Sequence, residues 1–94
     1  MAITTVDINA TTVGTPSVTV AVANPKRVKL VIKNTSANPV RVGFTNPQTA
    51  TTGTRLAQNE SFVLEGEKVP TDAVYGIREG GSDGTVSGYE MTKS

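Results

Sequence analysis

Residues 27–44 read RVKLVIKNTSANPVRVGF, and this stretch decides the fold class of the chain. Val28, Leu30 and Ile32 fall on one side of an extended backbone, and Lys29, Val31 and Lys33 fall on the other. A polar turn follows, and apolar residues alternate again in 40–44. Strict alternation predicts half-buried β-strands, so we expect these two strands and their turn to form a hairpin.

The same period-two pattern recurs in 18–23, and 61–65, 73–78 and 85–91 read as further strands. No window carries the spacing of an amphipathic helix. We therefore expect an all-β protein, a single small antiparallel β-sandwich that is jelly-roll or Greek-key-like. Shorter strands around 58–60 suggest a second hairpin, and 80–84 reads as a tight turn of the Asp-Gly type. The expected core residues are Leu30, Ile32, Val42, Phe44, Phe62 and Leu64.

The composition agrees with a sheet protein and excludes several chemistries. The 94 residues include fifteen threonines and thirteen valines but three leucines, and β-branched residues favour strands. The chain has no cysteine and no histidine, which excludes disulfides, thiolate metal sites and the usual acid–base residue. A chain of this length fits one domain. We expect residues 17–94 to form the sandwich and residues 1–16 an N-terminal arm or its first strand.

Candidate catalytic groups are few, and we expect a protein that is not an enzyme and holds no cofactor. The six serines have no histidine to activate them. Glu65 and Glu67 are spaced like a carboxylate pair but flank a glycine at a strand end, where acids usually keep a turn soluble. The glycine-rich run 80–84 lacks the lysine of a phosphate loop. Tyr75 and Tyr89 are the remaining candidates, either as a sugar-stacking platform or as partly buried core rings.

Charge is distributed unevenly along the chain. Residues 8–59 contain six bases and no acid, whereas residues 60–94 contain seven acids and three bases. The two sets can solvate different faces, pair across a sheet, or form a partner-facing patch. The candidate basic face consists of Lys26, Arg27, Lys29, Lys33 and Arg41. Without interleaved exposed aromatic residues, nucleic acid is not the expected partner.

The ends of the chain give further expectations about location and contact. No stretch approaches the roughly 20 apolar residues of a membrane span, and the N-terminus lacks the features of a secretory signal, so we expect cytoplasmic synthesis and no membrane partner. The threonine-rich start alternates Thr4, Val6 and Ile8, which are the candidate contact residues of an arm. Such an arm can add a strand to a neighbouring chain or to a capsid loop, or it can be an ordinary first strand.

The order of segments in 27–77 resembles small β-sandwich virion proteins of tailed bacteriophages, which include head decoration (cement) proteins and small fibre or tail accessory domains. The resemblance rests on 27–36 and 38–44, followed by 53–56, 61–64 and 73–77, and it covers about half of the chain. The position between the two valines of 40–42, often aromatic in such segments, is Arg41 here.

This resemblance implies a non-enzymatic structural role on the capsid surface of a virion made in a host cytoplasm. The implied partner is the major capsid protein, whose subunits the chain would bridge, and the implied assembly is a homo-oligomer, with a trimer favoured. The alternative is a receptor- or carbohydrate-binding module of a phage tail or fibre.

Overall fold

The computed structural model describes residues 2–49, 51–66 and 68–93 and shows eight strands and no helix among them. The strands are β1 (Ile3–Val13), β2 (Val18–Ala21), β3 (Arg27–Asn34), β4 (Val40–Gly43), β5 (Thr54–Leu56), β6 (Ser61–Glu65), β7 (Val74–Arg78) and β8 (Gly84–Lys93). They form two antiparallel four-stranded sheets, which we call sheet I (β1-β8-β3-β6) and sheet II (β2-β7-β4-β5). The expected all-β antiparallel sandwich is confirmed.

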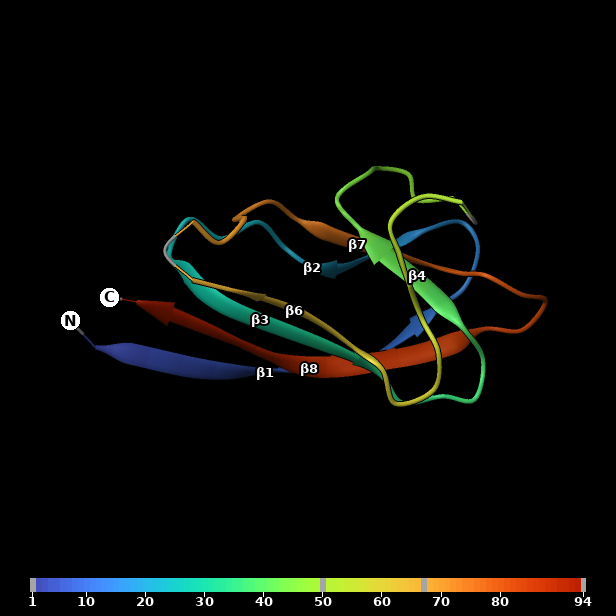
Figure 1. Cartoon of the computed structure of the whole chain (residues 1–94), viewed down its shortest axis with the longest axis horizontal. Helices are drawn as coiled ribbons and strands as arrows, with labels where there is room; N and C mark the ends of the chain where they lie inside the picture. The colour runs from blue at the N-terminus through green and yellow to red at the C-terminus, as the bar shows by residue number, and fades with distance from the viewer. Residues whose placement is uncertain (1, 50, 67, 94) are drawn as a thin grey trace.

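The pairing of the strands identifies the topology. β1 pairs with β8, β2 with β7, β3 with β6 and β4 with β5. The chain is therefore a long hairpin that reverses at β4–β5 and wraps over both sheets, which is the jelly-roll arrangement. Figure 1 shows sheet II above the longer sheet I. The first half of the sequence consequently lies beside the second half along the whole molecule.

The prediction of hairpins around residues 34–39 and 58–60 is wrong, although the predicted strands are present. β3 lies in sheet I and β4 in sheet II, and the same change of sheet occurs between β5 and β6 and between β7 and β8. Each of these connections crosses from one layer to the other. Alternation records which residues face the core, and a strand in either sheet has the same alternation. Between the described strands, β4 and β5 are the consecutive pair that forms a hairpin.

The core lies between the two sheets and consists mainly of β-branched residues. Its buried members are Val13, Val20, Ala21, Leu30, Ile32, Val40, Val42, Leu56, Val74 and Val86. Leu30, Ile32 and Val42 are confirmed as core, and Phe62 and Leu64 pack against it while partly buried. Phe44 is not core: it follows the end of β4, stays 41% exposed and meets the ring of Phe62 at 6.2 Å between centroids.

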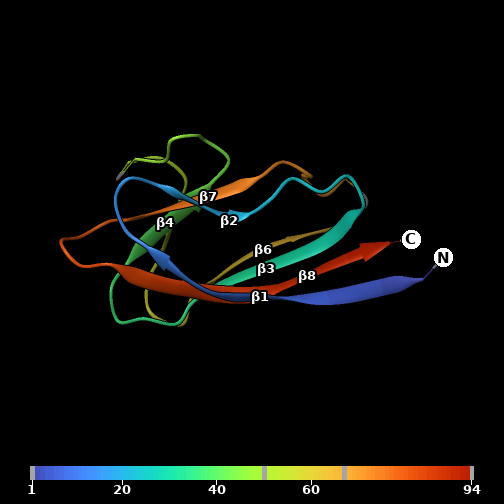
Figure 2. The same cartoon turned by 180° about the vertical axis from the view of Figure 1, so that it is seen from behind.

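The molecule is elongated because sheet I is longer than sheet II. Its principal extents are 44 × 22 × 17 Å. Ile3 pairs with Lys93, so the two ends of the chain lie side by side. Figures 1 and 2 show this paired end of β1 and β8 projecting beyond sheet II. One end of sheet I is thus left outside the sandwich.

Candidate interaction surfaces

The segment expected as an N-terminal arm or as a first strand contains β1, a strand of the chain's own sheet I. Thr4, Val6 and Ile8 all lie in β1 and pair with β8 through residues 88–92. Val6 shares its row with Glu90 and Leu30, which places it on the core-facing side, yet it is 57% exposed. Ile8 is partly buried against the core. β1 forms one edge of the sheet, so its outer side meets no further strand of the described chain.

The five residues of the candidate basic face do not lie together. Lys26 is exposed in the turn before β3, and Lys29 and Lys33 project from the outer face of sheet I. Arg41 belongs to β4 in sheet II, and its row-mate there is Arg55. The side chain of Arg27 is fully buried. The five residues therefore do not form one continuous surface, because the jelly roll sends β3 and β4 to opposite layers.

Arg27 has an internal role instead. Its Nε contacts Glu90 Oε2 at 2.5 Å, and its Nη2 donates to the Val22 carbonyl at 2.8 Å. Its Nη1 donates to the carbonyls of Pro70 and Asp72 at 3.1 and 2.9 Å. This single guanidinium ties β3 to β8 and to two loops, and it closes the end of the core nearest the termini. Charge alone gave no sign of this burial in the sequence.

The outer face of sheet I has an apolar row that sequence reasoning did not select. Val63, Val31 and Tyr89 are direct neighbours on β6, β3 and β8. Val63 is 47% exposed. The sequence feature that could have indicated this row is Val31, the apolar residue between Lys29 and Lys33 on the outer face of β3. This row gives the outer face an apolar centre between charged ends.

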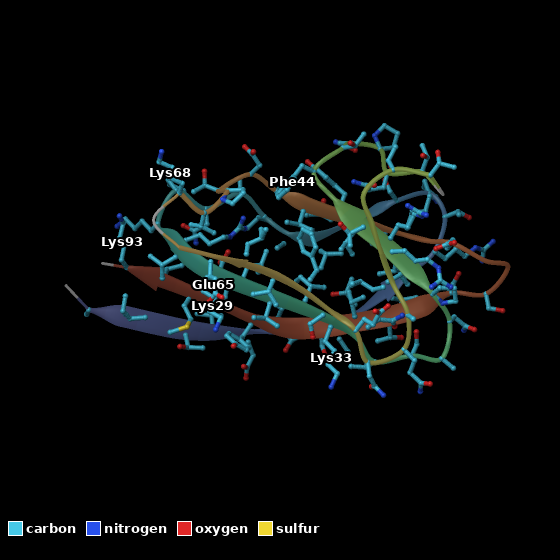
Figure 3. All side chains as sticks on the ribbon, in the orientation of Figure 1. Lys29, Lys33, Phe44, Glu65, Lys68 and Lys93 are labelled. Atoms are coloured by element: carbon cyan, nitrogen blue, oxygen red, sulfur yellow. The ribbon has the colours of Figure 1, made fainter. Side chains whose placement is uncertain are left out.

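Lys29 borders this row and is held in place by two neighbours. Its Nζ lies 5.9 Å from the centroid of the Tyr89 ring and 3.5 Å from Glu65 Oε2. The Tyr89 phenol and then the Glu65 carboxylate raise the pKa of Lys29 above its ordinary value. Figure 3 shows Lys29 beside Glu65, with Lys33 farther along the strand. Lys29 therefore stays protonated at neutral pH and is already paired.

Ion pairs join the two halves of the sequence. Arg27 reaches Glu90, and Lys29 reaches Glu65. Arg41 and Arg55, directly opposite on β4 and β5, both approach Glu79 Oε2, at 3.5 and 2.9 Å. In each case a base from the acid-free half meets an acid from the acidic half. Of the alternatives that the sequence leaves open, pairing between halves accounts for these charges, and a large single-sign patch does not form from them.

The remaining candidates for chemistry are not assembled into a site. Glu65 is paired with Lys29, and Glu67 lies outside the described residues. The run 80–84 connects β7 to β8, and an Arg78–Asp83 ion pair of 2.8 Å links the two sides of this connection. Val74 faces the core, so Tyr75, the next residue of β7, lies on the outer side of sheet II. Tyr89 lies on the outer side of sheet I. The two rings are on opposite faces and do not form a common platform.

No family model, no curated protein and no solved structure matches this chain. Within the residues described, no three histidine, cysteine, aspartate or glutamate side chains are grouped to hold a metal ion. The same part of the chain contains no helix long and apolar enough to cross a membrane. The exposed edge β1 and the apolar row of sheet I are the candidate interaction surfaces.

Proposed function

We propose that this chain is a non-enzymatic structural protein of a bacteriophage virion, which decorates the capsid and stabilises it by bridging major capsid protein subunits. The observation that carries the proposal is the strand order of the two sheets, β1-β8-β3-β6 and β2-β7-β4-β5. Jelly rolls with this double wrapping occur in viral capsid domains, lectins and cupins. This support is an analogy at the level of the fold, and the resemblance of residues 27–77 to phage virion proteins agrees with it.

The residues favour the capsid role over the other uses of the fold. Metal-binding cupin chemistry relies on histidine, the commonest protein metal ligand, and the sequence has none. A carbohydrate site usually needs aromatic faces gathered at one place, and Tyr75 and Tyr89 lie on opposite sheets. A decoration protein needs only stable surfaces that complement a neighbour, which this sandwich offers at β1 and on sheet I.

Apolar contact supplies more of the expected affinity than charge does. Fully burying a valine or isoleucine side chain contributes about 1.5–3 kcal/mol, whereas an exposed ion pair contributes about 0–1 kcal/mol. Lys29 and Arg55 already have acidic neighbours in the chain. Binding to capsids should therefore weaken only modestly when salt is raised, because screening acts mainly on exposed charges.

Add-back to capsids tests the proposal. Virions made without this chain should rupture at a lower temperature than complete virions, and purified chain should bind them saturably and restore the rupture temperature. The Arg27→Met variant, which we expect to be less stable, is the control: if protection requires the folded sandwich, this variant should protect capsids less well than the intact chain. Failure of the intact chain to bind or protect capsids contradicts the proposal, and binding to host cells or glycans instead supports the alternative module.

A further inference from the structure

The four sheet edges of this molecule are unequal. β2, β5 and β6 are edge strands of four, three and five residues, whereas β1 is an edge strand of eleven. β2 also contains an irregularity in its pairing, and β5 and β6 carry the charged Arg55 and Glu65. Short length, bulges and charges are the usual means of preventing edge-to-edge pairing. β1 is by far the longest of the four edges, and Asp7 is the one charge on it.

The first half of β1 is suited to receive another strand. Residues 3–8 pair with β8 without interruption, and the register shift comes only after Ile8. Ile3 and Val6 are 45% and 57% exposed on opposite faces. β1 contains no lysine and no proline, and Asp7 is its one charged residue. This stretch combines unpaired backbone groups on one side with apolar side chains that remain in water.

We infer that the partner of this edge is a second copy of the chain, paired antiparallel through residues 3–9 about a two-fold axis at Val6. Directly opposite residues of an antiparallel pair share a face, so a two-fold axis perpendicular to the sheet passes midway between the two copies of one residue. At Val6 the axis places Val6 against Val6 of the partner subunit and Thr4 against Ile8 of the partner subunit. Sheet I then continues into a sheet of eight strands.

The charge on the edge favours this register. With the axis at Val6, Asp7 faces Thr5 of the partner subunit, whose hydroxyl can donate to the carboxylate. An axis at Asp7 would oppose two like charges, which is destabilising. The net charge of +1 adds little repulsion between copies. An axis at Thr5 also separates the aspartates, but it leaves the two Val6 side chains apart, so it buries less apolar surface.

The interface is small, and the dimer should be concentration-dependent. A single pair of strand edges falls in the class of weak interfaces below about 1,200 Å². A two-fold dimer presents every outer surface twice, which is the arrangement a bridging protein needs. The inference does not depend on the capsid proposal, since the dimer forms from this chain alone.

Sedimentation equilibrium over a wide concentration range tests the dimer. The mass should rise from that of one 9.8 kDa chain towards twice that value. Val6→Lys should raise the dissociation constant about tenfold or more, because two lysines would face each other at the axis. Val63→Lys makes the same change at the opposite edge of sheet I and should leave dimerisation unchanged. A mass of one chain at all concentrations overturns the inference, as does a trimer or dimer that Val6→Lys leaves intact.

Single cysteines test the register, since the protein has no cysteine of its own. Under mild oxidation, cross-linking of Val6→Cys should exceed that of Thr5→Cys and Asp7→Cys, because only the residue on the axis meets its own copy. Val63→Cys reports random collision. Strongest cross-linking at position 7, or at position 63, overturns the proposed pairing. Circular dichroism of each variant verifies that the sandwich remains folded.

Discussion

Two buried polar side chains, Arg27 and Asn34, stabilise this fold through hydrogen bonds to backbone carbonyls, which add to a small apolar core. Arg27 binds one carboxylate and three backbone carbonyls at one end of the sandwich. Asn34, fully buried, donates to the carbonyls of Asn38 and Leu56 and accepts from the backbone and hydroxyl of Ser36. Both residues bind backbone groups of the connections, and Asn34 also binds the carbonyl of Leu56 at the end of β5. These two positions hold the connections between sheets in place.

Replacing Arg27 by methionine tests this role. Arg27→Met leaves Glu90, only 16% exposed, without its cation and leaves carbonyls of two loops without donors. Breaking a buried ion pair typically costs about 3–5 kcal/mol of unfolding free energy. Urea unfolding should show a loss of this size, whereas Lys33→Met on the exposed outer face should change stability by less than about 0.5 kcal/mol. Equal losses for both variants would contradict the structural role of Arg27.

Burial, and not side-chain size, should rank the apolar residues. Leu30→Ala removes a fully buried side chain and should cost about 2–5 kcal/mol. Phe44 is larger but 41% exposed, so Phe44→Ala should cost less than Leu30→Ala. Urea unfolding of both variants gives the comparison. A larger loss for Phe44→Ala would place that ring deeper in the core than the structure has it.

At the level of strands, the sequence predicts what each strand buries but not which strand it pairs with. The alternation of Leu30 and Ile32 with lysines correctly assigns the inner and outer faces of β3. The turn after Asn34 reads as a hairpin turn, because polar turn residues are the same whether a chain reverses within a sheet or crosses to the other sheet. In this structure, Asn34 at the end of β3 donates a hydrogen bond to the carbonyl of Leu56, a residue far along the chain. Long-range contacts of this kind leave no local pattern.

β8 approaches β3 closely at Gly88, where there is no room for a side chain. A Cβ atom at Gly88 would overlap the Val31 carbonyl oxygen, whereas one at Gly80 would meet nothing within 4 Å. Gly88→Ala must therefore push the central strands of sheet I apart and should cost about 1–3 kcal/mol, the range for overpacking. Gly80→Ala is the matched control and should be nearly neutral. Thermal unfolding of the pair measures this, and equal stability of the two variants would show that β8 and β3 are less close.

For the molecule as a whole, topology explains the uneven charge of the sequence. A jelly roll lays the first half of the chain beside the second, so the basic half and the acidic half meet, as they do at Arg27–Glu90 and Lys29–Glu65. The order of charges along the chain left pairing and a partner-facing basic patch as alternatives, because it does not contain this pairing of strands. The β1 edge and the apolar row on sheet I are exposed, and the charge pattern of the sequence points to neither of them.

The copy number of this chain in purified virions tests the central claim most directly. The heads and tails of a phage whose genome encodes the chain can be separated. Mass spectrometry then measures the amount of the chain in each fraction relative to the major capsid protein. We predict that the chain is found with the heads, at a fixed ratio to the major capsid protein that stays constant between preparations. Absence from virions, or presence at a few copies with the tails alone, would contradict a capsid decoration protein.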